Sequence, residues 1–115
     1  MSLERILRTL EGLGLSRVES EVYVYLAKSG PSKTKEIGAG LRMTQRQVYS
    51  TLNALKKKGI VISRPERARM FSAIAFDELL NLFMKARAEK AKAIKETKQE
   101  LVDSWRDITK QDDNS

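Results

Sequence analysis

The chain has 115 residues and contains neither cysteine nor histidine, which excludes disulfides, zinc sites built from thiolates or imidazoles, and the commonest general bases. The net charge of +7 is unevenly distributed: residues 1–75 hold 14 Lys and Arg against 6 Asp and Glu, whereas residues 76–115 hold 8 against 9. This asymmetry predicts a polyanionic partner for the first part, and a generally basic, soluble protein is the alternative.

No catalytic cluster of carboxylates, lysines, tyrosines or hydroxyls is evident, so the sequence predicts no enzyme. No apolar run reaches the roughly 20 residues of a membrane span, and the charged N-terminus differs from a signal peptide. We therefore expect a cytoplasmic protein with no membrane, no metal and no cofactor, and no small-molecule effector is evident.

Two amphipathic helices are predicted at the start of the chain. The first spans Leu3 to Leu13, where apolar residues recur at helical spacing. Ser16 followed by Glu19 is a capping-box pattern that starts the second helix, and Gly30-Pro31 ends it. The positions of the second helix that we expect to be buried are Val18, Val22, Tyr25 and Leu26.

The stretch from Thr34 to Lys58 is predicted to be a helix-turn-helix. Ser32 or Thr34 is expected to cap its first, short helix. Lys33 and Lys35 lie near the start of that helix, where the macrodipole disfavours cations. Either a phosphate approaches this helix start or the two are surface lysines without a role.

The second helix of the pair is expected to run from Thr44 to Lys58. Thr44 and Gln47 form another capping-box pattern, and Gly59 suits the left-handed conformation that ends a helix. Its apolar stripe consists of Val48, Leu52 and Leu55. The opposite arc carries groups that can read bases and phosphates, and no carboxylate; a solvated face of an ordinary helix is the alternative. That arc consists of Gln45, Arg46, Tyr49, Ser50, Asn53, Lys56 and Lys57.

Residues 60–75 are predicted to form a β-hairpin. Two short β-prone runs, 60–62 and 70–74, flank a polar loop that contains Pro65. A basic hairpin directly after a helix-turn-helix is typical of a wing, although a plain exposed hairpin also favours charged residues. The loop has one acid, Glu66, and three cations, which are Arg64, Arg67 and Arg69.

A long helix is predicted from Asp77 to about Ile108, in a run without Gly or Pro. The apolar residues between Leu79 and Met84 are dense enough to pack on a core. Farther on, the apolar positions thin to a heptad seam, interrupted by Arg87 and Lys98, that is typical of a weak two-stranded coiled coil, parallel or antiparallel. The seam consists of Leu80, Met84, Ala91, Ile94, Leu101, Trp105 and Ile108.

The run from Leu13 to about Ile74 resembles the N-terminal winged helix-turn-helix domain of the TrmB family of transcriptional regulators. The similarity rests on a Leu-Gly-Leu opening, a Glu-x-x-Val-Tyr helix, a Gly-Pro before the helix-turn-helix, a Val-Tyr in its second helix and a Lys-Gly-hydrophobic run at the wing. MarR-like and other winged-helix regulators share much of this pattern. The resemblance implies a DNA-binding transcription factor of archaeal or bacterial type, with its recognition helix at 44–58 and its wing at 60–75. Full-length members carry a sugar-binding domain, but here only a single helix follows, so sugar sensing is not implied.

The resulting fold prediction is mainly α with a small β-hairpin. It comprises a winged helix-turn-helix DNA-binding domain over residues 1–75, a long C-terminal dimerisation helix over 76–109 and a disordered tail over 110–115. The expected function is that of a transcriptional regulator that binds double-stranded DNA sequence-specifically as a homodimer, with the recognition helix in the major groove. A winged-helix protein-interaction module in a transcription or other macromolecular complex is the alternative.

The expected DNA contacts fall into two groups, because base edges specify and phosphates position. For some of these residues a structural role is the alternative. Lys56 to Lys58 can simply complement the helix dipole, and the ring of Tyr49 can pack under the wing. Base reading is expected of Gln45, Arg46, Ser50 and Asn53, next to the cap Thr44. Backbone contacts are expected of Lys33, Lys35, Tyr49, Lys56, Lys57, Arg64, Arg67 and Arg69.

Overall fold

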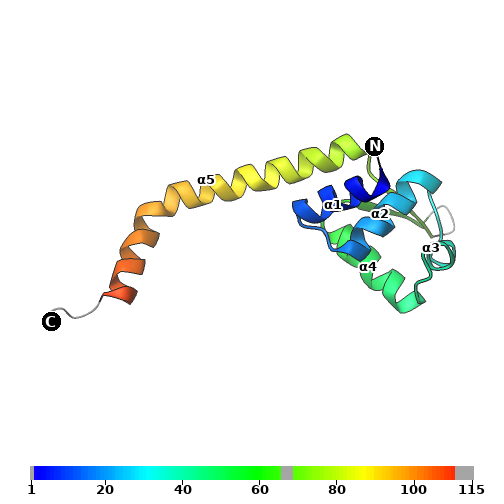
Figure 1. Ribbon diagram of the computed structural model, residues 1–115, viewed down its shortest axis with the longest axis horizontal. Helices are drawn as coiled ribbons and strands as arrows, with labels where there is room; N and C mark the ends of the chain where they lie inside the picture. Colours follow the sequence, from blue (N-terminus) through cyan, green and yellow to red (C-terminus); the bar gives the residue numbers. More distant parts are fainter. Residues whose placement is uncertain (1, 66–68, 111–115) are drawn as a thin grey trace. The chain divides into compact units, whose positions relative to one another are not determined.

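The computed structural model describes residues 2–65 and 69–110. The elements are α1 (Leu3–Leu13), α2 (Arg17–Ser29), α3 (Thr34–Leu41), α4 (Gln45–Lys57), β1 (Val61–Arg64), β2 (Met70–Ala73) and α5 (Phe76–Thr109) (Figure 1). The fold is mainly helical with one small hairpin, as the sequence predicts. The chain divides into two compact units, Met1–Leu79 and Leu80–Ser115. Arg67 and residues 111–115 of the expected tail lie outside the described residues.

The helix starts follow the capping patterns in the sequence, with one exception. Ser16 and Glu19 exchange hydrogen bonds of 2.8 and 3.0 Å, and Thr44 and Gln47 do the same at 2.9 and 3.2 Å. The expectation that Ser32 or Thr34 caps α3 is wrong, because the N-cap is Lys33.

At this exception one half of the capping-box arrangement is kept, in which the acid three residues after the N-cap binds the N-cap backbone. The Glu36 carboxylate accepts a hydrogen bond of 2.7 Å from the Lys33 backbone N–H. Ser32 is not free to act as the cap, because its hydroxyl donates to the Gly30 carbonyl and its backbone pairs with Phe71 of β2.

The core of the first unit is built around α2, which contacts α1, α3, α4 and β2. The prediction for Val22 and Leu26 is confirmed, but Val18 is 43% exposed and Tyr25 is only half-buried. Tyr23 is buried instead, and its hydroxyl donates to the Ile74 carbonyl at 2.9 Å. The hairpin therefore covers the side of α2 that carries Tyr23, and Val18 lies outside the buried face of this helix.

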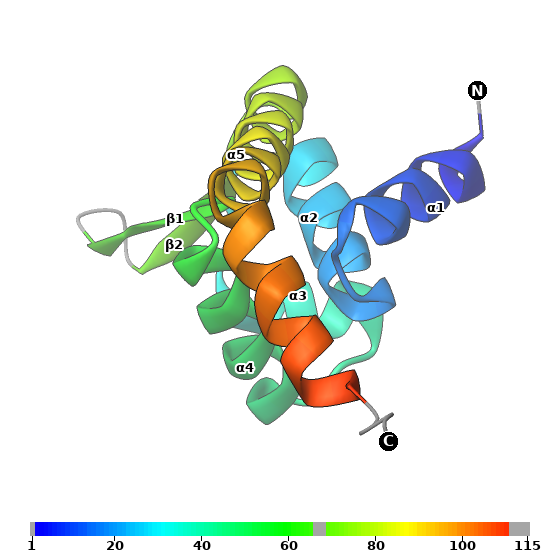
Figure 2. The same ribbon diagram turned by 90° about the vertical axis from the view of Figure 1, so that its left-hand side faces the viewer.

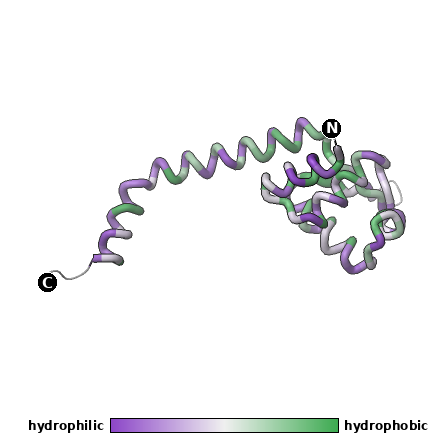
Figure 3. The backbone as a smooth tube through the Cα atoms, in the orientation of Figure 1, coloured by the Kyte–Doolittle hydropathy of each residue, from purple (hydrophilic) through white to green (hydrophobic). Residues whose placement is uncertain are grey.

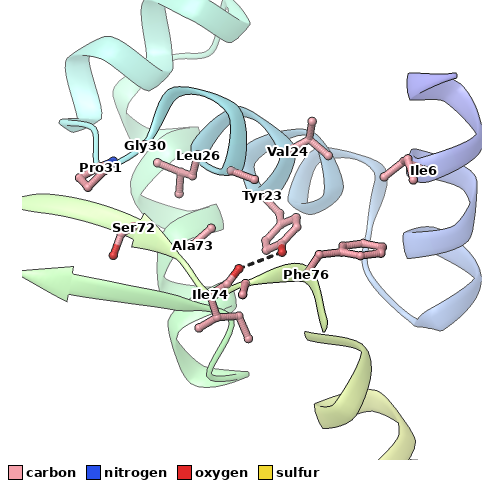
Figure 4. A pocket seen from close by; sticks show the side chains of 12 residues that line it. Ile6, Tyr23, Val24, Leu26, Gly30, Pro31, Ser72, Ala73, Ile74 and Phe76 are labelled. Carbon is pink, nitrogen blue, oxygen red and sulfur yellow. Dashed lines mark hydrogen bonds between the residues drawn. The ribbon is translucent and has the colours of Figure 1, made fainter. Parts of the chain in front are cut away.

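A hollow of about 420 Å³ lies beside this contact, between α2 and the base of the hairpin (Figure 4). Ile6 of α1 and Phe76 close one end of it, and Pro31 lies at the other. Burial raises the pKa of Tyr23 above its ordinary value, and the charges of Asp77 and Glu78 add to this effect. The hydroxyl consequently keeps its proton and remains a donor to the hairpin.

The two strands pair antiparallel, from Val61 opposite Ala73 to Arg64 opposite Met70. Arg64 therefore belongs to β1 and not to the loop, which corrects the predicted strand end. Figure 2 shows the hairpin projecting from the helices on the side away from α1. An additional bridge joins Ser32 to Phe71 through two backbone hydrogen bonds of 2.8 and 2.9 Å. This bridge attaches the start of α3 to the wing.

Helix α5 extends one residue beyond the predicted range at each end. Leu79 is buried, but Leu82 is exposed and Met84 is 67% exposed, so the expectation of a dense core segment through Met84 is wrong. From Leu80 onward the described part of the second unit consists of this helix alone, so no other element of its unit can cover these side chains. Along α5, hydrophobic positions recur among hydrophilic ones (Figure 3).

Candidate nucleic-acid interface

Helix α4 has one buried and one exposed face, as the sequence pattern requires. Val48, Leu52 and Leu55 are fully buried in the first unit. Tyr49 is 51% exposed, so its ring is not buried in the core. All seven residues of the predicted recognition arc are exposed: Gln45, Arg46, Tyr49, Ser50, Asn53, Lys56 and Lys57.

The start of α4 is braced against α3. The Gln45 side-chain amide donates to the Thr34 carbonyl at 3.2 Å. Gly38 makes this close approach possible, because a Cβ at its position would lie 2.7 Å from Gln45 Nε2 and 3.0 Å from the Met43 carbonyl oxygen. Gln45 therefore holds the two helices at a fixed separation, while its neighbour Arg46 remains exposed.

A groove of about 540 Å³ lies where the start of α3, the exposed face of α4 and the hairpin meet. It brings together three groups of predicted site residues: Lys33 and Lys35 from α3, Tyr49 from α4, and Arg69 from the hairpin. The bridge between Ser32 and Phe71 explains this meeting, because it fixes the residue before Lys33 beside β2. Sequence reasoning missed the remaining lining residues, which are Thr34, Ser63, Pro65 and Phe71.

The described acids of the first unit before α5 are engaged in structural contacts. One cluster joins α1 to α2, because Arg17 contacts Glu4 at 2.8 Å, Glu11 at 3.1 Å and Glu21 at 3.8 Å. Hydrogen bonds from Arg17 lower the pKa of the Glu4 carboxyl. These acids are paired with Arg17 away from the groove, whose described lining includes cations but no carboxylate.

A second ion pair ties the end of α4 to the start of α2. Lys58 Nζ contacts both carboxylate oxygens of Glu19, at 3.0 and 3.1 Å. Burial raises the pKa of the Glu19 carboxyl, but hydrogen bonds from the Ser16 backbone and from Lys58 outweigh it, so the pKa lies below its ordinary value. Lys58 is thus a structural cation although its side chain is 41% exposed, and Lys56 and Lys57 are exposed as well.

The predicted wing arginines have different surroundings. The Arg64 guanidinium donates to the Ser72 hydroxyl at 3.0 Å and is half-buried on the hairpin. Arg69 is exposed, lines the groove and has a left-handed backbone with φ of 60°. The third, Arg67, belongs to the segment outside the described residues.

Among the described residues, no three acidic side chains gather closely enough to hold a metal ion. None of the helices in the described ranges combines the length and hydropathy that a bilayer span requires.

Comparison with known proteins identifies relatives by sequence. The sequence model of a family described as sugar-specific transcriptional regulator TrmB matches residues 10–77. The HTH-type sugar sensing transcriptional regulator TrmBL1 of Pyrococcus furiosus is 36% identical over 58 residues. That match covers 50% of this chain but only 17% of TrmBL1, so the chain spans a small part of this relative.

Solved structures share the fold. TrmBL2, an archaeal chromatin protein, superimposes with a TM-score of 0.81 at 21% identity, over 93% of this chain and 42% of TrmBL2. A MarR-like regulator from Thermotoga maritima superimposes with a TM-score of 0.52 at 21% identity, over 91% of this chain and 97% of its own. The winged helix-turn-helix, the α5 helix that follows it and the family match over more than half of the sequence agree: this chain belongs to the TrmB family of transcriptional regulators.

Proposed function

We propose that this chain is a transcriptional regulator that binds double-stranded DNA through its first unit and acts as a homodimer. The observation that carries the proposal is the cationic groove formed by Lys33, Lys35, Tyr49 and Arg69 beside the exposed face of α4. Side chains of these types bind phosphate oxygens, and a helix with amide and guanidinium groups can read base edges in the major groove. A DNA-binding regulator fits these features better than an enzyme does.

In this proposal the groove and the recognition arc have different tasks. The groove residues, together with Lys56, Lys57 and the wing arginines, hold backbone phosphates and set the register of the protein on the duplex. Arg46 reads a base, for which guanine offers two acceptors to a guanidinium. Ser50, Asn53 and Gln45 are further candidates for base contacts, with Thr44 fixing the helix start beside them.

The second unit supplies the homodimer. The seam of α5 leaves Trp105 65% exposed and Ile108 77% exposed, which is costly in water and favourable when two helices pair. The domain boundaries we propose remain a DNA-binding domain at 1–75 and a dimerisation helix at 76–109. Transcription regulators gain affinity by pairing two half-site readers, which gives the seam a purpose.

Salt dependence of duplex binding tests the role of the groove. A variant with Lys33, Lys35 and Arg69 all replaced by Ala should bind random and specific duplexes more weakly. The dependence of log affinity on log salt should also flatten by about 0.9 for each phosphate that the variant no longer neutralises. Fluorescence anisotropy with a labelled duplex at several salt concentrations measures both quantities.

The control removes the same number of charges from the outer face of α5, where Lys85, Lys92 and Arg106 are exposed. Replacing these three residues by Ala should leave the salt slope close to that of the parent. Equal slopes for the groove variant and the parent would refute the groove assignment. Absence of duplex binding by the parent would instead favour a protein-interaction module.

A further inference from the structure

We infer that two copies of the chain pair their α5 helices antiparallel, in a register centred near Glu96. This rests on the homodimer proposed above and adds the direction of pairing and the residues that face each other. The relevant feature is the charge pattern of α5, which occupies residues 76–109 as one continuous helix. The seam and its two interruptions form two columns in the heptad pattern. One column is Leu80, Arg87, Ile94, Leu101 and Ile108; the other is Met84, Ala91, Lys98 and Trp105.

A parallel pair places like charges against each other. In a parallel, in-register coiled coil each seam residue faces its own copy, so Arg87 meets Arg87 and Lys98 meets Lys98. The positions that flank the seam add to this repulsion in the parallel pair, because Lys90 of one helix approaches Lys95 of the other. Four cations from each helix would thus gather within the middle of the interface.

No acid of α5 is placed to compensate these cations. The acids between residues 80 and 110 all fall on two of the three outward heptad positions, away from the seam. They are exposed in the structure: Glu89, Glu96, Glu100, Asp103 and Asp107. The repulsion in a parallel pair would therefore remain unscreened by the partner helix, and a core-position charge is known to determine orientation and register.

An antiparallel pair removes the conflict within the seam, because the two columns then face each other. When the pair is centred near Glu96, Arg87 lies opposite Trp105 of the second copy, where a guanidinium over an indole ring is favourable. Lys98 lies opposite Ile94, along which its aliphatic stem can pack while the ammonium reaches water. The two remaining layers pair Leu101 with Ala91 and Ile108 with Met84.

The neighbouring antiparallel register is less favourable. Shifted by one heptad, it gives good apolar layers at both ends, with Trp105 on Leu80 and Leu101 on Met84. However, it sets Lys98 directly opposite Arg87 twice, once on each side of the centre. Of these two registers, only the centred one keeps every cation of the seam opposite an apolar or aromatic side chain.

Spin labels on single cysteines test the direction, since the chain has no native cysteine. Thr97→Cys lies close to the proposed centre and Thr109→Cys lies near the end of α5. An antiparallel pair should give strong dipolar broadening at position 97. At position 109 it should give a distance of about 40 Å, from the helical rise of about 1.5 Å per residue. Parallel pairing would place both pairs of labels within about 20 Å and would overturn the inference.

The same measurement separates failure of the direction from failure of the dimer. A monomer shows neither broadening at position 97 nor a resolved distance at position 109, and this overturns the proposed homodimer as well. A second variant tests the cause: Arg87→Leu with Lys98→Leu, in the Thr109→Cys background, removes the charges that oppose parallel pairing. A new population of short distances is expected, and a distribution unchanged from the charged parent would show that these cations do not set the direction.

Discussion

At the scale of single residues, the first two side chains of α4 have different surroundings although they are adjacent. Gln45 is bonded to the Thr34 carbonyl, whereas Arg46 is exposed at the start of the helix. A side chain already bonded to its own protein is less free to follow a base edge. The structure therefore makes Arg46 the stronger candidate for reading sequence.

Replacing Arg46 by Ala should relax the preference at one base pair. The expected cost is about 1–3 kcal/mol on the preferred sequence if the guanidinium bonds a guanine in two places. Selection of bound sequences from a random pool, followed by titration, measures this change. Lys92→Ala on α5 is the control. If the parent, Arg46→Ala and Lys92→Ala all select the same site, Arg46 does not read a base.

Gly38 and Gly12 provide a matched pair of glycines within helices. A Cβ at Gly38 would crowd Gln45 Nε2 and the Met43 carbonyl, whereas nothing lies within 4 Å of a Cβ at Gly12. Gly12→Ala should therefore stabilise the protein by up to about 1 kcal/mol, because alanine favours a helix over glycine. Gly38→Ala should not gain this stability. It should also weaken DNA binding, because the added methyl group would displace the Gln45 side chain that joins α4 to α3.

Denaturant unfolding and duplex titration of both variants measure these two effects. If Gly38→Ala is as stable as Gly12→Ala and binds DNA like the parent, the close approach has no role in presenting α4.

At the scale of secondary-structure elements, ion pairs attach the helices to one another. The Glu19 carboxylate serves two elements at once, since it caps α2 and binds Lys58 at the end of α4. Its pKa is lower when the chain is folded, so folding is favoured by its ionisation. This contribution to stability is fully present above the unfolded pKa of about 4.3 and is lost as the pH falls through the folded value.

Glu19→Gln should consequently lower Tm at neutral pH and reduce the loss of Tm between about pH 5 and pH 2. Thermal unfolding followed by circular dichroism over this range provides the measurement. The control is Glu89→Gln, an exposed acid on the outer face of α5, which should preserve the parent's pH profile. Identical profiles for both variants would show that the Glu19 contacts do not stabilise the fold.

At the scale of the whole molecule, the exposed seam of α5 predicts that the second unit is completed by another chain. Leu101 and Trp105 are each more than half exposed, and burial of each could contribute about 1.5–3 kcal/mol. Leu101→Asp with Trp105→Asp should give a folded monomer with much weaker binding to its DNA site.

Sedimentation equilibrium together with duplex titration checks this prediction. Ala86→Asp with Ala93→Asp adds the same charge at exposed positions outside the seam and should remain a dimer. A parent protein that is monomeric at tens of micromolar, or a seam variant that still dimerises, would show that the seam does not join two copies.

The sequence by itself determined the features that depend on neighbouring residues. Each capping box joins residues three positions apart, so Ser16 with Glu19 and Thr44 with Gln47 could be recognised directly. The buried stripe of α4 follows from helical periodicity, because one helix face alone carries Val48, Leu52 and Leu55. The heptad seam of α5 is local in the same sense, although periodicity alone does not show how much of it is covered.

Only the tertiary structure decided which groups from distant parts of the chain meet. Tyr23 is buried in place of Val18 because its hydroxyl reaches the end of the hairpin, 51 residues away. Lys33 lies at the same groove as Arg69 because Ser32 pairs with Phe71. Such contacts leave no periodic signal, since either partner has an ordinary composition in its own segment. The geometry of the candidate interface therefore arises from packing between elements, whereas the elements themselves arise from local pattern.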